Sequence, residues 1–429
     1  MRWVKSGTAA FRNALLAAER RGGTESDKVR PVVSEILARV RKGGDDALAE
    51  YTLRFDRFDP RRTGFRLSPR AVEAGWSRTS KRLRGSLEAA AERIDAFHRK
   101  QREEGFTLEY PGAVVGQRVL PVARAGVYVP GGKAAYPSTL LMNAIPARVA
   151  GVREIYAACA APGGTVPDVV LAAARIAGVT GLFRIGGAQA IAALAYGTES
   201  VPKVDVVTGP GNAYVTEAKR QVYGTVGIDM LAGPSELVVL ADRTARAAYV
   251  AADLLSQAEH DEDAFVALVT DSPALARKVG AELSRQSAAL PRKKILAAAL
   301  SRACGFLVKG IPEGIETVNR LAPEHLSVMV EDPWAALGKI RNAGTAFLGP
   351  YSPVAVGDYI AGINHTLPTG GAARFSSPLG VANFLKRINV VSYQSQALAV
   401  DAPHVVRIAG KEGLLAHARA VRVRTEGGG

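Results

Sequence analysis

The chain has 429 residues, 48% of them apolar and 22% charged, and a formal net charge of +15. At about 150 residues per domain, this length favours two or three domains with large cores. No apolar run reaches the ~18 uncharged residues that a membrane span needs. The N-terminal segment has neither the apolar core nor the small-residue cleavage site of a signal peptide. We therefore expect a cytoplasmic protein with no membrane partner.

The basic residues are spread along the chain and interleaved with acidic ones. There is no basic block, no helix-turn-helix signature and no aromatic-basic RNA motif, so we expect no nucleic-acid partner. Instead, a solvated basic surface can attract anionic cofactors. The two cysteines, Cys159 and Cys304, both lie in apolar settings. Two cysteines supply neither a disulfide framework nor a thiolate zinc site.

The N-terminal quarter of the chain has a helical pattern. Residues 11–20 form a short amphipathic segment, and residues 30–55 carry apolar side chains at helical spacing until Gly43 and Gly44 break it. A second, charged helical stretch covers residues 70–105. We expect these helices to precede the strands of the fold.

From about residue 113, short β-rich runs alternate with Ala-rich helical runs. We predict strands at 126–129, 154–158, 182–185, 204–207, 236–241, 265–271, 305–308, 325–330 and 344–348. We predict helices at 167–177, 188–196, 213–222, 246–258, 273–286 and near 412–420. This alternation is typical of parallel sheets covered by helices on both faces. Two separate α/β sheets are expected, meeting near residues 233–235.

The histidines are few and unusually placed. Of six, three lie in polar clusters, Gln257-Ala-Glu-His260, Glu324-His325 and Asp358 to His365, and His417 lies near Glu412. Imidazole and carboxylate are ligands of Zn²⁺ and general acids and bases near neutral pH. The clusters favour metal-assisted proton chemistry. The structural alternative is a solvated helix face or a hydrogen-bonded core histidine at each position.

Three Gly-rich turns follow predicted strands and open helices: Pro130-Gly-Gly132, Gly186-Gly-Ala-Gln189 and Gly209-Pro-Gly-Asn212. Exposed amides at a helix N-terminus can bind phosphate. Tyr214 stands where a dinucleotide fingerprint has its third glycine, and no acid follows at the usual distance. By motif alone the nucleotide signal is weak, and ordinary βα turns also need glycine.

Together these segments resemble histidinol dehydrogenase, over about residues 30–420. The resemblance is carried by Val40-Arg-Lys-Gly-Gly-Asp45 with Phe55-Asp56, Gly126-Val-Tyr-Val-Pro-Gly-Gly132 with Tyr136-Pro-Ser138, Gly186-Gly-Ala-Gln-Ala190, Gly209-Pro-Gly-Asn212 and Ile228-Asp-Met-Leu-Ala-Gly-Pro-Ser-Glu236. The most specific segments are Leu255-Ser-Gln-Ala-Glu-His260, Ala322-Pro-Glu-His-Leu326, Gly357-Asp358, Asn364-His-Thr-Leu-Pro-Thr369 and Glu412 to His417. Ser327, after the Glu-His-Leu core, is a flanking difference.

The resemblance implies an NAD-linked oxidation of L-histidinol through L-histidinaldehyde to L-histidine, with one Zn²⁺ per chain. The zinc ligands would be Gln257, His260, Asp358 and His417. By the same carry-over, His325 would be the general base and Glu324 would activate water. Ser235, His365 and Glu412 would join these residues in binding substrate, and Tyr128, Gln189 and Asn212 would contact NAD⁺.

The resemblance and the sequence texture together give a domain plan. We expect α/β architecture with two parallel-sheet, incomplete Rossmann-like domains, a helical N-terminal segment and a small C-terminal tail domain. The plan has an N-terminal arm at 1–25, a first α/β domain from 26–127 plus 236–380, an NAD-binding second domain at 128–235 and a tail at 381–429. The first domain would carry the acid–base pair and most metal ligands.

The tail favours a homodimer with shared sites. It is too small to bury much apolar surface alone, and two-fold dimers are the commonest assembly. Five positions along a helix separate Glu412 from His417, so the two side chains do not share a face and must reach one site from its edge. Two alternatives stay open: a relative that oxidises another small amino- or sulfo-alcohol, and a non-enzymatic NAD- or metal-binding module.

Overall fold

A computed structural model describes residues 1–21, 26–131 and 135–426. The chain divides into two compact units. Unit 1 comprises residues 1–101 and 123–384, and unit 2 comprises residues 102–122 and 385–429. Within the described ranges, no helix is both long and apolar enough to cross a membrane.

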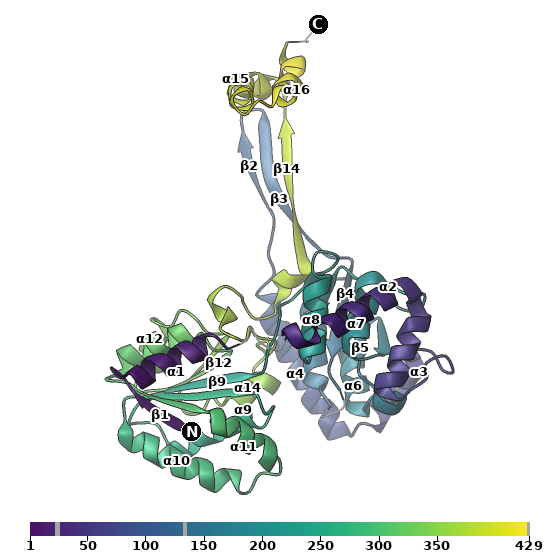
Figure 1. Ribbon diagram of the computed structural model, residues 1–429. Helices are drawn as coiled ribbons and strands as arrows, with labels where there is room; N and C mark the ends of the chain where they lie inside the picture. Colours follow the sequence, from purple (N-terminus) through teal and green to yellow (C-terminus); the bar gives the residue numbers. More distant parts are fainter. Residues whose placement is uncertain (22–25, 132–134, 427–429) are drawn as a thin grey trace. The chain divides into compact units, whose positions relative to one another are not determined.

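The first sheet of unit 1 is parallel and six-stranded (Figure 1). Its strand order is β1 (Arg2–Lys5), β11 (Cys304–Leu307), β10 (Phe265–Thr270), β9 (Glu236–Ala241), β12 (His325–Met329) and β13 (Thr345–Leu348). The helices associated with it are α1 (Ala9–Glu19), α9 (Ala247–Ala258), α10 (Pro273–Ser287), α11 (Lys293–Arg302), α12 (Ile311–Leu321), α13 (Pro333–Leu337) and α14 (Val354–Tyr359).

Strand β9 shows why this sheet is covered on both sides. All six of its residues are buried. Leu237 and Val239 pack in one apolar cluster with α9, α10 and α11, whereas Val238 and Leu240 pack in another with α1 and α12. A continuous apolar run is typical of parallel strands that have helices on both faces.

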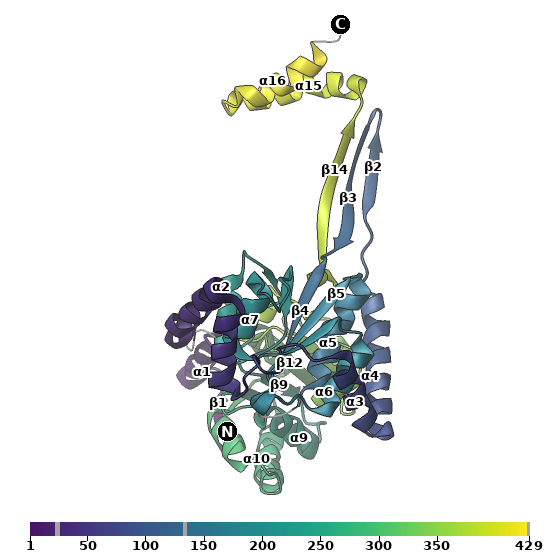
Figure 2. The same cartoon turned by 90° about the vertical axis from the view of Figure 1, so that its right-hand side faces the viewer.

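The second sheet of unit 1 is parallel and five-stranded (Figure 2). Its order is β6 (Gly181–Arg184), β5 (Glu154–Cys159), β4 (Arg124–Val129), β7 (Val206–Thr208) and β8 (Gly227–Ile228). Its helices are α5 (Pro137–Ala150), α6 (Asp168–Ala177), α7 (Gly187–Tyr196) and α8 (Ala213–Val222), with the 3₁₀ turn η1 (Pro162–Gly164). The short 3₁₀ turns η2 (Ala372–Arg374) and η3 (Val381–Phe384) occur later in unit 1.

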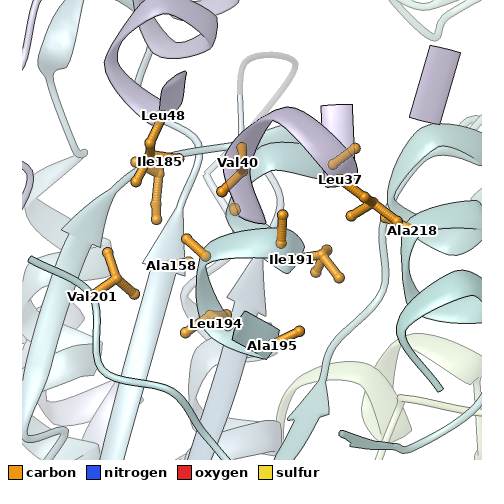
Figure 3. Packing of buried hydrophobic residues seen from close by; sticks show 14 of the residues in the cluster. Leu37, Val40, Leu48, Ala158, Ile185, Ile191, Leu194, Ala195, Val201 and Ala218 are labelled. Carbon is orange, nitrogen blue, oxygen red and sulfur yellow. The ribbon is translucent and has the colours of Figure 1, made fainter. Parts of the chain in front are cut away.

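The N-terminal helices pack on this second sheet, which differs from the expected domain plan. These helices are α2 (Ser26–Asp56), α3 (Pro69–Arg78) and α4 (Lys81–Arg99). Leu37, Val40 and Leu48 of α2 pack with residues of α7 and α8 in one core (Figure 3), whereas we had placed residues 26–127 with 236–380. Helical periodicity shows which face of a helix is apolar, but it does not specify the sheet that the face covers.

The remaining differences from the plan concern the N-terminus and the tail. Residues 2–5 of the expected helical arm form the edge strand β1, paired with β11. In unit 2, β2 (Phe106–Tyr110), β3 (Ala113–Pro121) and β14 (Leu385–Tyr393) form an antiparallel sheet, followed by α15 (Ser395–Lys411) and α16 (Leu415–Thr425). Residues 102–122 thus belong with the tail. The strand pairing that joins them is non-local and leaves no local signal.

Most predicted elements are confirmed. Strand β9 and helix α8 have the predicted bounds, and the other strands and helices that were predicted for the two parallel sheets agree to within about two residues. Strands β1 and β8 and helices α5, α11, α12, α13 and α14 were not predicted. The expected break in α2 is a kink at Gly44, which has φ +50°. Gly44 combines φ +50° with ψ −134°, a conformation that residues with a Cβ rarely adopt, which explains glycine at this position. The α/β architecture with two parallel sheets is therefore confirmed.

Candidate functional site

The predicted acid–base pair lies where strand order reverses in the six-stranded sheet. The chain runs outward from β9 to β10 and β11 on one side and to β12 and β13 on the other. His325 is the first residue of β12 and Glu236 is the first residue of neighbouring β9. Ligands of open α/β sheets usually bind at the carboxyl ends of the strands. Here the clustered polar side chains instead occupy the amino ends.

The backbone before β12 lets adjacent side chains reach the same region. Helix α12 ends at Leu321, and its C-cap residue Ala322 has a φ of +45°, which is rare for a residue with a Cβ. Glu324 forms a bend ahead of the strand, so the side-chain alternation of a regular strand does not yet apply. Its Oε2 lies 3.5 Å from Nδ1 of His325. The irregular backbone needed for two neighbours to share one site is present.

The imidazole of His325 is held at one nitrogen and free at the other. Nδ1 lies 2.9 Å from the backbone carbonyl of Glu236, to which it donates a hydrogen bond. Because the carbonyl can only accept, this contact assigns the proton to Nδ1 in the neutral ring. Nε2 is buried, has no hydrogen-bond partner and lies 3.7 Å from Oδ1 of Asp358. A buried nitrogen without a partner is costly and is typical of a functional group.

The acid–base pair and Asp358 shift one another's pKa values because the three side chains are buried close together. Burial lowers the pKa of His325, but the carboxylates of Glu324 and Asp358 outweigh burial and raise that pKa to about 10. Burial raises the pKa of Glu324, and His325 partly opposes the rise. Burial also acts to raise the pKa of Asp358, but His325 holds it below its usual range. The three groups therefore form one coupled, proton-holding cluster.

Two further predicted histidines lie beside Asp358. His365 donates from Nδ1 to the backbone carbonyl of Asp358 at 3.1 Å, and its Nε2 lies 3.4 Å from the hydroxyl of Thr139. Burial lowers the pKa of His365, although Asp358 opposes this. The pKa of His260 is also lowered, because burial of the imidazole outweighs the opposing effect of Asp358, although the residue as a whole is exposed. Three of the predicted site segments therefore meet at Asp358.

Three of the four predicted zinc ligands belong to unit 1, and their side chains are of types that bind divalent cations. Gln257 is buried in the last turn of α9, and His260 follows directly, with its backbone N–H bonded to the Gln257 carbonyl at 3.2 Å. Amide oxygen, imidazole nitrogen and the carboxylate of Asp358 are suitable ligands. In the described ranges no three His, Cys, Asp or Glu side chains form a ready metal site. His417, the fourth predicted ligand, is exposed on α16 of unit 2.

The other substrate-binding predictions divide between the two units. Ser235 precedes β9 and is half-buried, and its carbonyl accepts the N–H of Phe265 at 2.9 Å. Glu412 caps the end of α15 in unit 2 and is exposed. Ser235 therefore belongs to the strand edge that carries the acid–base pair, and Glu412 is presented by the same unit as His417.

The predicted NAD⁺ contacts gather at the reversal point of the five-stranded sheet. Strand order reverses between β4 and β7. Tyr128 is near the carboxyl end of β4, and Asn212 follows β7 and caps α8 by accepting the N–H of Val215 at 3.1 Å. Gln189 is buried in the first turn of α7, where the Tyr128 hydroxyl accepts the N–H of Gly187 at 3.0 Å. Carboxyl-end crevices of this kind bind dinucleotides.

The Gly-rich turns have different structural roles. Gly209, with φ +113°, approaches the backbone of Tyr128 so closely that a Cβ would lie 2.2 Å from its carbonyl oxygen. Its N–H is bound by Asp229 at 2.8 Å and its carbonyl by Lys219 at 2.9 Å. Only Pro130 and Gly131 of the first predicted turn can be placed, because Gly132 lies outside the described residues.

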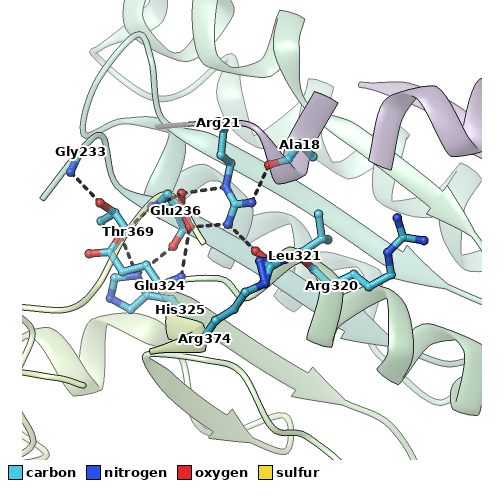
Figure 4. Close-up of polar contacts among 11 residues, drawn as sticks. Ala18, Arg21, Gly233, Glu236, Arg320, Leu321, Glu324, His325, Thr369 and Arg374 are labelled. Carbon is cyan, nitrogen blue, oxygen red and sulfur yellow. Dashed lines mark hydrogen bonds and ion pairs between the residues drawn. The ribbon is translucent and has the colours of Figure 1, made fainter. Parts of the chain in front are cut away.

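Sequence reasoning missed two charged residues behind the acid–base pair: Glu236, which is hydrogen-bonded to Glu324 and His325, and Arg21, which binds Glu236. Glu236 is buried at the head of β9, and Arg21 follows α1 and binds both of its carboxylate oxygens at 2.7 Å (Figure 4). The available signal was a carboxylate directly before an otherwise apolar strand. Such a charge requires a partner once it is buried.

A buried imidazole with one nitrogen left without a hydrogen-bond partner, beside two carboxylates, is typical of a site that transfers protons. Comparison with known proteins agrees. Residues 19–425 match the family model described as histidinol dehydrogenase, and the chain belongs to that family. It is 48% identical to the histidinol dehydrogenase of Geobacter metallireducens over 97% of this chain and 95% of the relative. Identity to that of Syntrophotalea carbinolica is 47%, covering 99% of each chain.

A solved structure supports the fold directly. The crystal structure of histidinol dehydrogenase from Elizabethkingia anophelis matches with a TM-score of 0.93 at 34% sequence identity. The match covers 100% of this chain and 98% of that chain. Family membership indicates an oxidoreductase of histidine biosynthesis.

Proposed function

We propose that this enzyme oxidises L-histidinol to L-histidine in two NAD⁺-dependent steps. The first step removes a hydride and a proton from the primary alcohol and gives the aldehyde. Water then adds to the aldehyde, and a second hydride transfer gives the carboxylate. Overall, one alcohol, one water and two NAD⁺ yield one carboxylate, two NADH and three protons.

The observation that carries this proposal is the state of His325. Its Nδ1 is committed to the Glu236 carbonyl, while Nε2 is buried without a hydrogen-bond partner. An alcohol is too weak an acid to ionise at neutral pH, so hydride loss needs a positioned proton acceptor. In this assignment Nε2 of the neutral ring takes the alcohol proton. Asp358, whose Oδ1 lies 3.7 Å from Nε2, raises the pKa of His325, and it would raise that pKa less once its carboxylate also held a Zn²⁺.

Glu324 is assigned to the aldehyde step. Its Oε2 lies 3.5 Å from Nδ1 of His325, and burial raises its pKa. A carboxylate with a raised pKa is a stronger base than one in water, which suits removal of a proton from the water that adds to the aldehyde. His325 and Glu324 then serve successive proton transfers from one place.

Gln257, His260, Asp358 and His417 would hold one Zn²⁺. Bound zinc would supply a fixed positive charge that orients the substrate's amine and imidazole nitrogens. Two imidazoles, one carboxylate and a neutral amide leave the site near a charge of +1, which suits substrate orientation better than formation of a strong hydroxide. Ser235, His365 and Glu412 would complete the substrate contacts.

One NAD⁺ site per chain is proposed at Tyr128, Gln189 and Asn212. Support comes from their place at the reversal point of the five-stranded sheet. Because one nicotinamide must serve both oxidations, the aldehyde has to stay bound while NADH leaves and NAD⁺ enters. Contacts from the metal ligands and Glu412 give a physical reason for that retention.

We also propose a homodimer in which unit 2 of each chain completes its partner's site. Unit 2 exposes many large apolar side chains, including Phe106, Tyr110, Val391 and Leu415. Apolar surface of this extent on a small unit is typical of a protein interface. Its helices bury mainly small alanines, such as Ala402 and Ala409, so packing against a partner would stabilise it.

A steady-state assay tests the function. Purified enzyme with L-histidinol should form two NADH per substrate, and a chelator should stop turnover until Zn²⁺ is restored. Other small amino- and sulfo-alcohols serve as comparison substrates. A preference for one of them, measured by kcat/KM, would contradict histidinol as substrate, and no turnover of any alcohol would contradict an enzymatic function.

A further inference from the structure

Arg21, which follows the N-terminal helix α1, is bound on several sides. Its Nε and Nη2 donate to the two carboxylate oxygens of Glu236, each at 2.7 Å. Nη2 also donates to the carbonyl of Leu321 at 2.7 Å, and Nη1 donates to that of Ala18 at 2.6 Å (Figure 4). The guanidinium lies 4.6 Å above the ring of Phe265. Such a two-pronged, stacked guanidinium is geometrically fixed.

The contact to Leu321 places Arg21 at the end of the helix that leads into the acid–base pair. Leu321 is the last residue of α12, and its carbonyl is among those that a helix leaves without an internal partner. A cation at a helix C-terminus also interacts favourably with the helix dipole. Arg21 therefore holds the start of the left-handed turn at Ala322, two residues before Glu324.

Glu236 connects this guanidinium to the acid–base pair. Its Oε2 accepts the backbone N–H of Glu324 at 3.2 Å, and its Oε1 accepts that of Gly370 at 2.7 Å. Its own N–H is bound by Oε2 of Glu324 at 2.7 Å, and its carbonyl accepts Nδ1–H of His325 at 2.9 Å. Backbone and side chain of one residue thus hold both members of the pair.

Two buried carboxylates face each other across these bonds, which requires a nearby positive charge. The side chains of Glu236 and Arg21 are 3% and 12% exposed, so water screens their interaction weakly. Removing the guanidinium would leave the Glu236 carboxylate buried beside Glu324 without a cation. The carboxylate would then have to move or become neutral, and the bonds that depend on it would weaken.

We propose that Arg21 and Glu236 are positioning residues of the reaction. Arg21 fixes the Glu236 carboxylate, and Glu236 fixes the backbone of Glu324 and the ring of His325 with Nε2 free. The N-terminal arm is thereby part of the catalytic apparatus without touching the substrate. This inference rests on the proposed function, because it assumes that His325 and Glu324 perform the proton transfers.

The test compares Arg21→Met, Arg21→Lys, Glu236→Gln and the double variant Arg21→Met/Glu236→Gln in the full-length enzyme. The matched control is Arg320→Met, which removes another arginine at the α1–α12 contact, one bound to Glu19 at 2.7 Å. We expect kcat to fall by roughly 10- to 100-fold in Arg21→Met, with KM for histidinol and NAD⁺ within about threefold of wild type. Arg320→Met should retain wild-type kcat.

The double variant tests whether Arg21 acts through Glu236. If it does, the double variant should be no slower than the slower single variant, because the two changes break the same chain of contacts. Arg21→Lys should recover only part of kcat, since an ammonium group cannot bind both carboxylate oxygens in a fork. Multiplicative losses in the double variant, or a kcat in Arg21→Met equal to that of Arg320→Met, would overturn the inference.

A second readout is independent of turnover. Side-chain ¹⁵N NMR of histidine-labelled enzyme should show a protected Nδ1–H for His325, assigned by its loss in His325→Asn, and the signal should disappear in Arg21→Met. Persistence of that signal in a folded Arg21→Met chain would overturn the positioning role. If wild-type enzyme does not oxidise histidinol, the proposed function fails while the NMR comparison still decides whether Arg21 holds the ring. If Arg21→Met does not fold, Glu236→Gln and Arg21→Lys carry the same test.

Discussion

Glu236 and Glu324 each accept the other's backbone N–H through a side-chain carboxylate, at 3.2 and 2.7 Å respectively. The two residues stand at the amino ends of neighbouring parallel strands. Backbone N–H groups at that edge have no further strand residue to bind, so they need other acceptors. The reciprocal pair satisfies both groups and sets the place from which His325 projects. An edge that is usually structural thereby carries the candidate acid–base machinery.

His325→Asn should lower kcat by roughly 10²–10⁴-fold while histidinol still binds, because asparagine cannot accept the alcohol proton. Turnover is measured by NADH formation and binding by calorimetry. The control is His98→Gln, since His98 is buried and its Nδ1 is bound to the Ile94 carbonyl at 2.7 Å. Wild-type kcat in His325→Asn would show that another group is the base.

Glu324→Gln should slow the oxidation of added histidinaldehyde more than that of histidinol, because only the aldehyde step needs an activated water. Single-turnover measurements with each substrate separate the two steps. Glutamine keeps the side-chain oxygen that can accept the Glu236 N–H, so the fold should be preserved. An aldehyde step at wild-type speed would contradict the assignment of water activation.

Purified wild-type enzyme should contain about one Zn²⁺ per chain by elemental analysis. His260→Ala and Asp358→Ala should each lose most of that metal, because each removes one of four ligands. His404, exposed on α15 and outside the predicted ligand set, provides the control variant His404→Ala. Full activity in excess chelator, with no stoichiometric metal, would rule out the zinc site. Mn²⁺ or Co²⁺ should restore activity to the stripped enzyme, since such ligands select weakly among these ions.

Co-refolding of His417→Ala with His325→Ala chains should restore activity to two inactive proteins. In a mixed dimer, the His417→Ala chain keeps its own His325 and receives an intact tail from its partner. Random pairing of equal amounts should recover about one quarter of wild-type sites. Each variant refolded alone is the control. Mixed dimers that form but remain inactive would show that unit 2 serves its own chain.

Asp253→Asn should stabilise the protein above about pH 6. Asp253 lies on α9, accepts the Ser327 hydroxyl at 3.3 Å and is 5% exposed, and burial raises its pKa from 3.8 to about 6. The folded chain therefore holds this proton more tightly than the unfolded chain, so the Asp253 contribution to stability falls as pH rises from about 4 to about 6. Above that range the buried Asp253 carboxylate lowers the free energy of unfolding by at most ~3 kcal/mol, and the uncharged amide removes this cost.

Thermal melting at pH 4 and at pH 7.5 checks this prediction. Asp263→Asn is the control, because Asp263 forms an exposed ion pair with Arg302 and should change stability by less than ~1 kcal/mol at either pH. If Asp253→Asn raised the melting temperature more at pH 4 than at pH 7.5, the predicted direction of the pH dependence would be wrong.

Much of the fold was readable from local sequence. The apolar run at 236–241 predicted β9, and Gly43 and Gly44 predicted the kink in α2. These signals depend on backbone conformation and on the alternation of polar and apolar residues within a few positions of each other. The clustered histidines and the ordered family segments likewise identified His325, Asp358 and His260 as candidates before their positions in space were known.

Tertiary structure decided which surfaces meet. The apolar face of α2 fits either sheet by periodicity, yet it packs against α7 and α8. Residues 102–122 join the tail only because β3 pairs with β14, across more than 250 positions of sequence. Arg21 reaches Glu236 over 215 positions. A local sequence pattern indicates that a side chain is buried or paired, but it does not identify the partner. The partner depends on how distant segments pack together. For this reason only the tertiary structure showed that Arg21 and Glu236 lie behind the acid–base pair.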